Sequence, residues 1–193
     1  MHPTVARLVE HFGLEPLPVE ATWFVSTYRS TADTAVGGPV GTAMIGLYCR
    51  GFDSGSDAGP DSRSLFHRLA FDEVWHFYGG QPIRMVLLHP DGTDDEVVLG
   101  GDPLAGQLVQ FVVPAGTWQA GELAPGGDWA LFGCTMAPGF TGTCFEGGSR
   151  SVLLATHPAR AADIERLGVP DDETTAMPEG FATAGPERDL SGT

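Results

Sequence analysis

The feature that most constrains the fold is a succession of short β-prone runs between about residue 22 and residue 157. Turn signals separate the runs, such as PDG at 90–92 and PGG at 125–127. Short strands at intervals of roughly 8–15 residues, without helices between them, are typical of an antiparallel sandwich or barrel. The runs are TWFVSTYR, TAMIGLYC, EVWHFYG, IRMVLLHP, DEVVLG, LVQFVVP, WALFGCTM and SVLLATH.

Short helices are predicted at both ends of this β-rich region. In VARLVEHFGL, apolar residues recur at helical spacing and Gly13 ends the segment. ARAADIERLG follows Pro158 and ends at Gly168, which indicates a closing helix. The polar stretch RGFDSGSDAGPDSRS at 50–64 is predicted to be a loop.

The chain of 193 residues is predicted to form one domain over residues 1–168, with the barrel itself at about 20–158. Residues 169–193 are acidic and contain few large apolar side chains. Such a segment cannot bury enough apolar surface to offset its ordering entropy, so we expect a mobile C-terminal tail.

Charge excludes several classes of partner. The formal net charge is −15, and all ten basic residues are arginines. An acidic surface repels phosphate backbones and anionic lipid, so we expect neither nucleic-acid nor membrane partners. The absence of lysine excludes Schiff-base chemistry on a side-chain amine.

Compartment and thiol state follow from simpler features. No apolar run reaches the length of a membrane span, and the first residues lack an apolar signal core, so we expect a cytoplasmic protein. Cys49, Cys134 and Cys144 are odd in number and lack zinc-site spacing. They are predicted to be buried, reduced thiols.

The segment SLFHRLAFDEVWHFYGG, at 64–80, carries the candidate chemistry. An imidazole and a carboxyl that meet in an apolar barrel have shifted pKa values and can exchange a proton with a substrate. We therefore predict His67 as a general base, with Glu73 or Tyr78 returning the proton. Alternatively, His67 holds the strands together by bonding to a neighbouring carbonyl or carboxylate.

His76 is the third candidate, both for catalysis and for a metal site made of His67, Glu73 and His76. Side chains alternate along a strand, so Glu73 and Trp75 should share one face while His76 and Tyr78 occupy the other. Only a β-bulge would allow Glu73 and His76 to enter the same pocket.

The pattern of His67, Glu73 and Gly80, with the later turn PAGTWQ, resembles the two halves of the cupin signature. The segments DEVWHFYGGQP, LGGDPLAGQLVQFVVPAGTWQAGEL, WALFGCTMAPGF and LLATHP resemble the cupin branch long labelled a domain of unknown function. That branch is similar in fold to the dTDP-sugar epimerases. The resemblance covers roughly residues 6–160 and implies a double-stranded β-helix, usually dimeric, with a pocket inside the barrel.

This sequence departs from the family's usual metal ligands at two positions. The resemblance implies histidines where Leu69 and Gln119 stand. A divalent metal takes three or four nitrogen, oxygen or sulfur donors, so His67 and Glu73 alone would hold it weakly. We therefore expect no cofactor; a divalent ion (Fe, Ni or Zn), completed by His76 or Gln119, is the alternative.

Further polar and aromatic side chains are candidates for binding a substrate. Glu20 and Arg29 match positions of the resembled family, and the arginine fork suits a carboxylate or phosphate. Amides near a barrel mouth can bond to a carbonyl or hydroxyl, and aromatic walls favour a flat or apolar ligand. The APGF turn at 137–140 is predicted to shape the pocket lip or a dimer contact, whereas His89 and His157 are predicted to be exposed. The candidates are Glu20, Arg29, Trp75, Gln107, Gln110, Trp118 and Gln119.

Three functions remain open at this point, because the cupin fold hosts many activities. The first is an isomerase, epimerase or dehydratase acting on a small molecule of specialised metabolism. The second is an iron-type oxygenase, and the third is a barrel that binds a small ligand without turning it over. A homodimer is expected from the resemblance and from the edge strands that an open barrel leaves uncovered.

Overall fold

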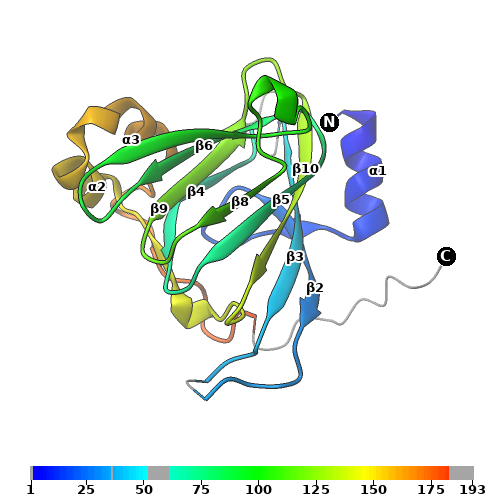
Figure 1. Cartoon of the computed structure of the whole chain (residues 1–193), viewed down its shortest axis with the longest axis horizontal. Helices are drawn as coiled ribbons and strands as arrows, with labels where there is room; N and C mark the ends of the chain where they lie inside the picture. Colours follow the sequence, from blue (N-terminus) through cyan, green and yellow to red (C-terminus); the bar gives the residue numbers. More distant parts are fainter. Residues whose placement is uncertain (1, 36, 52–60, 183–193) are drawn as a thin grey trace.

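The predicted all-β fold is confirmed by the computed structural model, which describes residues 2–35, 37–51 and 61–182. Two antiparallel sheets face each other (Figure 1). In spatial order, the first contains β1 (Glu15–Pro16), β2 (Trp23–Arg29), β3 (Thr42–Cys49), β10 (Trp129–Met136), β5 (Glu73–Gly80) and β8 (Gln110–Val113). The second contains β11 (Phe145–Gly147), β4 (Arg63–Leu69), β9 (Trp118–Leu123), β6 (Ile83–Leu88) and β7 (Asp94–Leu99).

The N-terminal helix α1 (Pro3–Phe12) confirms the helical spacing read from the sequence. It begins at Pro3, whose fixed φ suits the first turn, and it ends at Gly13, which has φ 61°. Its apolar side packs against the outer face of the first sheet, where Val5 meets Val25 and Leu47.

Two further helices cover the outer face of the second sheet (Figure 1). The predicted closing helix is α3 (Ala161–Leu167). The run SVLLATH, predicted to be a strand, is instead the helix α2 (Arg150–Thr156). A short apolar run does not distinguish strand from helix, and here Leu153 packs beside Ile164 of α3. The one-turn 3₁₀ segments are η1 (Pro103–Ala105), η2 (Gly142–Cys144) and η3 (Pro158–Arg160).

Two strands that matter for the site were absent from the β-prone runs. Part of β4 had been assigned to the polar loop, since Arg63 and Ser64 already belong to the strand; residues 52–60 lie outside the described residues. In β9, Gln119, Gly121 and Glu122 weaken the β signal. The strand forms because β4 and β6 pair with it on both sides.

One end of the space between the sheets is packed solid. Tyr48, Trp75 and Phe132 form its centre, with the Trp75 and Phe132 rings stacked at 4.8 Å. Gly46 pairs with Phe132 across β3 and β10, and a Cβ at Gly46 would overlap the phenylalanine ring. The apolar core therefore closes this end of the barrel.

The C-terminal segment was predicted to be a mobile tail from residue 169, but it packs against the barrel as far as residue 182. The N–H of Gly147 donates to the carbonyl of Thr175 at 2.7 Å. Val169 is buried and Met177 is only 9% exposed, packed with Leu69 and Phe145. Residues 169–182 therefore form part of the packed domain; residues 183–193 lie outside the described residues.

Candidate functional site

A cavity of about 370 Å³ opens at the end of the barrel opposite the packed core. The strands β2, β3, β4, β5 and β10 surround it, and the C-terminal segment supplies one further wall. Most of its lining is apolar, and its volume suits a small organic molecule. The apolar side chains include Leu17, Phe24, Met44, Leu69, Met136, Phe140, Phe145, Met177 and Phe181.

Three ionisable side chains face this cavity together: Glu20, His67 and Glu73. Each is deeply buried, with exposure of 6% for the Glu20 side chain, 4% for His67 and 8% for Glu73. Glu73 begins β5 of the first sheet and His67 lies on β4 of the second. The two predicted acid–base residues are thus brought into one enclosed space from opposite sheets.

The hydrogen bonds of His67 fix its tautomer. Its Nδ1 lies 2.8 Å from the carbonyl oxygen of Leu65, which can only accept, so Nδ1 carries the proton. Glu20 Oε1 lies 3.7 Å from the same nitrogen, and the ring stacks on Phe145 at 5.2 Å. In the neutral ring, Nε2 therefore holds the lone pair, and no hydrogen bond occupies it within the described residues.

Two side chains hold the Glu73 carboxyl in place. Its Oε2 accepts from Gln119 Nε2 at 2.8 Å and from Trp75 Nε1 at 3.0 Å, and Trp75 Nε1 also lies 2.9 Å from Gln119 Oε1. Burial raises the pKa of Glu73, and the charge of Glu20 adds to this; His67 and the bond from Gln119 oppose it. The result is a carboxyl that retains its proton to higher pH than an exposed glutamate.

Cys134 lines the same cavity and was not among the predicted site residues. It lies on β10 opposite Trp75, so alternation along the strand directs it inward. Burial, together with the charges of Glu73 and Glu20, holds its pKa well above the ordinary value. The thiol is therefore neutral and a poor nucleophile. All three cysteines are free and buried, as predicted.

His76 and Tyr78 lie on the opposite face of β5, away from the cavity. The irregularity in the pairing of β5 with β10 comes after Phe77, too late to turn His76 inward. His76 Nε2 lies 2.9 Å from Thr135 Oγ1, its Nδ1 accepts from Gln110 at 3.1 Å, and Tyr78 is 53% exposed. This corrects the predicted catalytic roles of His76 and Tyr78 and the predicted substrate contact of Gln110.

Four other predicted substrate contacts also lie outside the cavity lining: Trp75, Gln107, Trp118 and Gln119. Trp75 and Gln119 are buried behind Glu73, which they orient. Trp118 packs among the residues under α2, with the Arg68 guanidinium 4.5 Å from its ring. Gln107 lies in the loop before β8, where its Oε1 accepts from the N–H of Asp102 at 3.0 Å.

Glu20 and Arg29 do line the cavity, as the resemblance implied. Arg29 Nη1 donates to the carbonyl of Phe140 at 3.3 Å, and Phe140 itself contributes to the lining, so the APGF turn shapes the pocket. The prediction for His157 was wrong: it is buried, and its Nε2 lies 3.0 Å from the carbonyl oxygen of His89.

The cavity residues do not fit the metal centre that the family resemblance implied. Leu69 lines the cavity with methyl groups, and both amide atoms of Gln119 are engaged with Glu73 and Trp75. Within the described residues, no three His, Cys, Asp or Glu side chains are grouped so as to hold a metal ion. His76, the third ligand predicted, lies on the other side of the sheet.

This fold and site define a jelly-roll barrel with an ionisable pocket enclosed at one end. Residues 6–147 match the family described as Cupin superfamily (DUF985), and the chain belongs to that family. The cupin fold predicted from the sequence is thereby confirmed. No curated protein matches the chain.

Solved structures agree with this assignment. A protein from Shewanella oneidensis is 31% identical with a TM-score of 0.75, and the match covers 86% of this chain and 97% of that one. A hypothetical protein from Leishmania major is 22% identical with a TM-score of 0.72, covering 84% of this chain and 97% of that one. Enzymes also occur among the more distant cupin neighbours, including an oxalate decarboxylase from Lactobacillus farciminis. Its identity is 11% and its TM-score 0.47, over 80% of this chain and 41% of that one.

Among the described residues, no helix has the length and apolarity needed to cross a membrane.

Proposed function

We propose that this chain is an enzyme that moves a proton to and from a small organic molecule held in the cavity. The observation that carries the proposal is the placement of His67 and Glu73 in one buried space, with the Nε2 lone pair of the imidazole available. Proton abstraction beside a carbonyl, as in isomerases, epimerases and dehydratases, needs a base and an acid positioned together, and these two side chains can serve as that pair.

Each side chain has a role that its surroundings support. His67 Nε2 takes the proton from the carbon next to a carbonyl, and the electron pair of the broken C–H bond moves onto the carbonyl oxygen. Glu73 retains its proton because it is buried, so it can donate to that oxygen. The Glu20 carboxylate, 3.7 Å from Nδ1, stabilises the imidazolium that forms.

Deuterium exchange tests this proposal without knowledge of the natural substrate. The protein is incubated in D₂O with a panel of small 2-hydroxy, 2-oxo and 2-amino carbonyl compounds, and incorporation of deuterium is followed by mass spectrometry. We expect exchange in at least one compound, reduced at least 100-fold in His67→Gln. The matched control is His11→Gln, a change on the exposed side of α1 that should leave exchange unchanged.

The other outcomes identify the competing functions. Compounds that bind equally to the wild type and to His67→Gln, with no exchange in either, would show a binding protein and contradict the proposal. Exchange that disappears with EDTA but survives in His67→Gln would show that a divalent ion carries the chemistry.

A further inference from the structure

The Glu20 carboxylate is buried at the cavity wall and accepts no hydrogen bond from the part of the chain that the structure describes. Its side chain is 6% exposed. Within the described residues its one polar contact is with His67 Nδ1 at 3.7 Å, which is beyond hydrogen-bond range, and the proton on Nδ1 already points to Leu65. Glu20 faces the cavity, so a guest bound there can supply the hydrogen-bond donors that the described residues do not.

The charges around the cavity favour a donor that is also positive. Glu20 is the carboxylate that faces the interior, because burial raises the pKa of its neighbour Glu73 and keeps that carboxyl protonated to higher pH. The guanidinium of Arg29 also lines the cavity, but it donates to the carbonyl of Phe140. The net charge of −15 also attracts cations toward the chain as a whole.

The walls of the cavity suit a ligand with an apolar, preferably aromatic, body. Phe181 lies with its ring centre 5.8 Å from that of Phe24 and 6.2 Å from that of Phe140. Aromatic faces attract both flat apolar groups and cations, and methionine sulfur makes favourable contacts with aromatic rings. Met177 adds a thioether to the same C-terminal wall.

We propose that the cavity binds a protonated primary or secondary amine with an apolar body, whose N–H groups donate to the Glu20 carboxylate while the body lies against Phe24, Phe140 and Phe181. This inference rests on the pocket of the proposed function and names its substrate class. An ammonium held by Glu20 also places the adjoining carbon atoms near His67, since the two side chains approach within 3.7 Å.

Three ligands of similar shape and different charge test the inference by isothermal titration calorimetry in low salt at pH 7.5. They are 2-phenylethylamine, 2-phenylethanol and 3-phenylpropionate. We expect the amine to bind at least tenfold more tightly than the alcohol, and the acid to bind more weakly than either. In Glu20→Gln, the preference for the amine over the alcohol should fall to less than about threefold.

Glu146→Gln is the matched control, because Glu146 is an exposed carboxylate paired with Arg68 outside the cavity. It removes the same charge and should leave the preference intact. Circular dichroism shows whether Glu20→Gln is folded; if it is not, the ranking of the three ligands on the wild type decides alone. Absence of amine binding, tighter binding of the acid, or an unchanged preference in folded Glu20→Gln would overturn the inference.

The result is independent of the exchange experiment. Amine binding without exchange in any compound would leave this inference standing and remove the proposed function. Exchange confined to acids that bind more tightly than the amine would do the reverse.

Discussion

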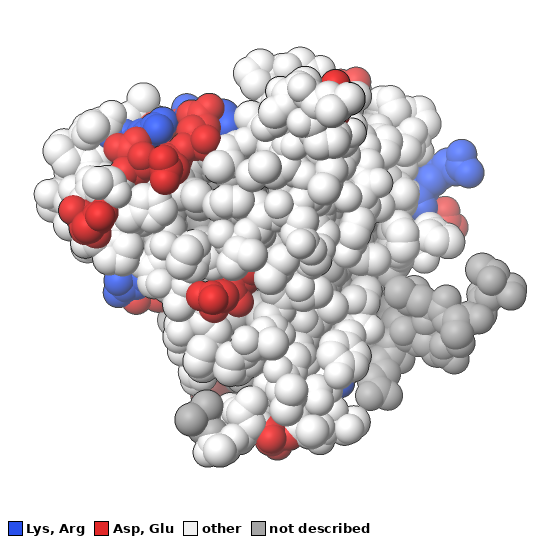
Figure 2. All heavy atoms as spheres, in the orientation of Figure 1, with Lys and Arg blue, Asp and Glu red and all other residues white. Residues whose placement is uncertain are grey.

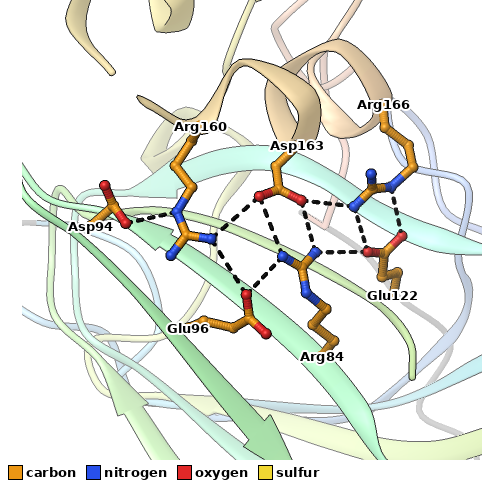
Figure 3. Close-up of polar contacts among 7 residues, drawn as sticks. All are labelled: Arg84, Asp94, Glu96, Glu122, Arg160, Asp163 and Arg166. Carbon is orange, nitrogen blue, oxygen red and sulfur yellow. Dashed lines mark hydrogen bonds and ion pairs between the residues drawn. The ribbon is translucent and has the colours of Figure 1, made fainter. Parts of the chain in front are cut away.

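Two clusters of charged side chains in this protein differ in how fully their charges are paired. The inner cluster, defined as Glu20, His67 and Glu73, faces the cavity inside the barrel. The outer cluster lies between α3 and the second sheet (Figure 3), at the end of the molecule where charges gather in Figure 2. We call it the arginine network; it consists of Arg84, Asp94, Glu96, Glu122, Arg160, Asp163 and Arg166.

In the arginine network, each charge meets at least one opposite charge at close range. Arg84 donates to Asp163 at 2.8 Å, to Glu122 at 2.9 Å and to Glu96 at 2.7 Å. Burial alone would raise the pKa of Asp163, but bonds from Arg84 and Arg166 outweigh it and leave the pKa below its ordinary value. The bond from Arg84 likewise lowers the pKa of Glu96.

The inner cluster shows the opposite behaviour. Burial raises the pKa of Glu73 despite two hydrogen bonds, and Glu20 has no close donor among the described residues. The arginine network fastens α3 to the sheet, so its charges serve structure. In the inner cluster, incomplete pairing leaves a carboxyl and an imidazole facing the cavity, and we propose that they exchange protons with a guest.

The largest expected effect is on the arginine network. Asp163→Asn removes the carboxylate that three arginines share, which leaves their charges in partly buried positions. We expect the free energy of unfolding at pH 7 to fall by about 2–3 kcal/mol, since loss of one partner leaves buried charge uncompensated. Urea unfolding measures the change.

The exposed pair of Arg68 and Glu146 provides the control for this prediction. Glu146→Gln should cost less than about 1 kcal/mol, because an exposed ion pair contributes little. The deficit of Asp163→Asn should also shrink as pH falls below about 4, where the unfolded wild type begins to bind the proton, and it should vanish once the folded carboxyl, with its lowered pKa, is protonated as well. Equal costs for the two variants would show that the network is not what stabilises this end of the fold.

Local sequence signals predicted part of the fold, whereas contacts between distant segments determined the rest. Turn residues and β-prone runs specify strands locally, and Gly13 specifies a helix end. The helix α2 was misread because SVLLAT is equally apolar in either state, and its helical form depends on Ile164 and the sheet beneath. Likewise, Met177 packs only because the barrel end offers Leu69 and Phe145.

The candidate site was likewise predictable from the sequence only in part. His67 and Glu73 were identified because their residue types and spacing resemble a family signature, and alternation along β5 placed His76 on the other face. Cys134 and Phe181 come from distant segments, and their approach to Glu73 and Phe24 depends on sheet pairing and on the C-terminal path. Trp75 and Gln119 were identified, but as substrate contacts instead of supports for Glu73.

A second prediction concerns the support of the inner cluster. Gln119→Leu removes a donor from Glu73 and an acceptor from Trp75 while keeping a side chain of similar size. We expect a loss of about 1–2 kcal/mol in the free energy of unfolding, because two buried polar groups each lose a partner. The pKa of Glu73, followed by ¹³C NMR of its carboxyl carbon, should rise further. A lower pKa, or no change in it, would show that Gln119 does not determine the protonation of Glu73.

The smallest expected effect has the opposite sign to that of Asp163→Asn and separates the two clusters most directly. A carboxyl whose pKa is raised on folding binds its proton more tightly in the folded state, so the wild type loses stability as pH rises above the unfolded pKa of 4.5. Glu73→Gln stays uncharged and keeps an oxygen for Gln119 and Trp75. We expect the free energy of unfolding of this variant to match that of the wild type near pH 4 and to exceed it by about 1 kcal/mol at pH 8. The difference between the two unfolding curves at each pH isolates Glu73, because all other carboxyls are common to both. A variant less stable than the wild type at pH 8 would mean that the charged form of Glu73 is paired in the folded protein, which would place the inner cluster in the same class as the arginine network.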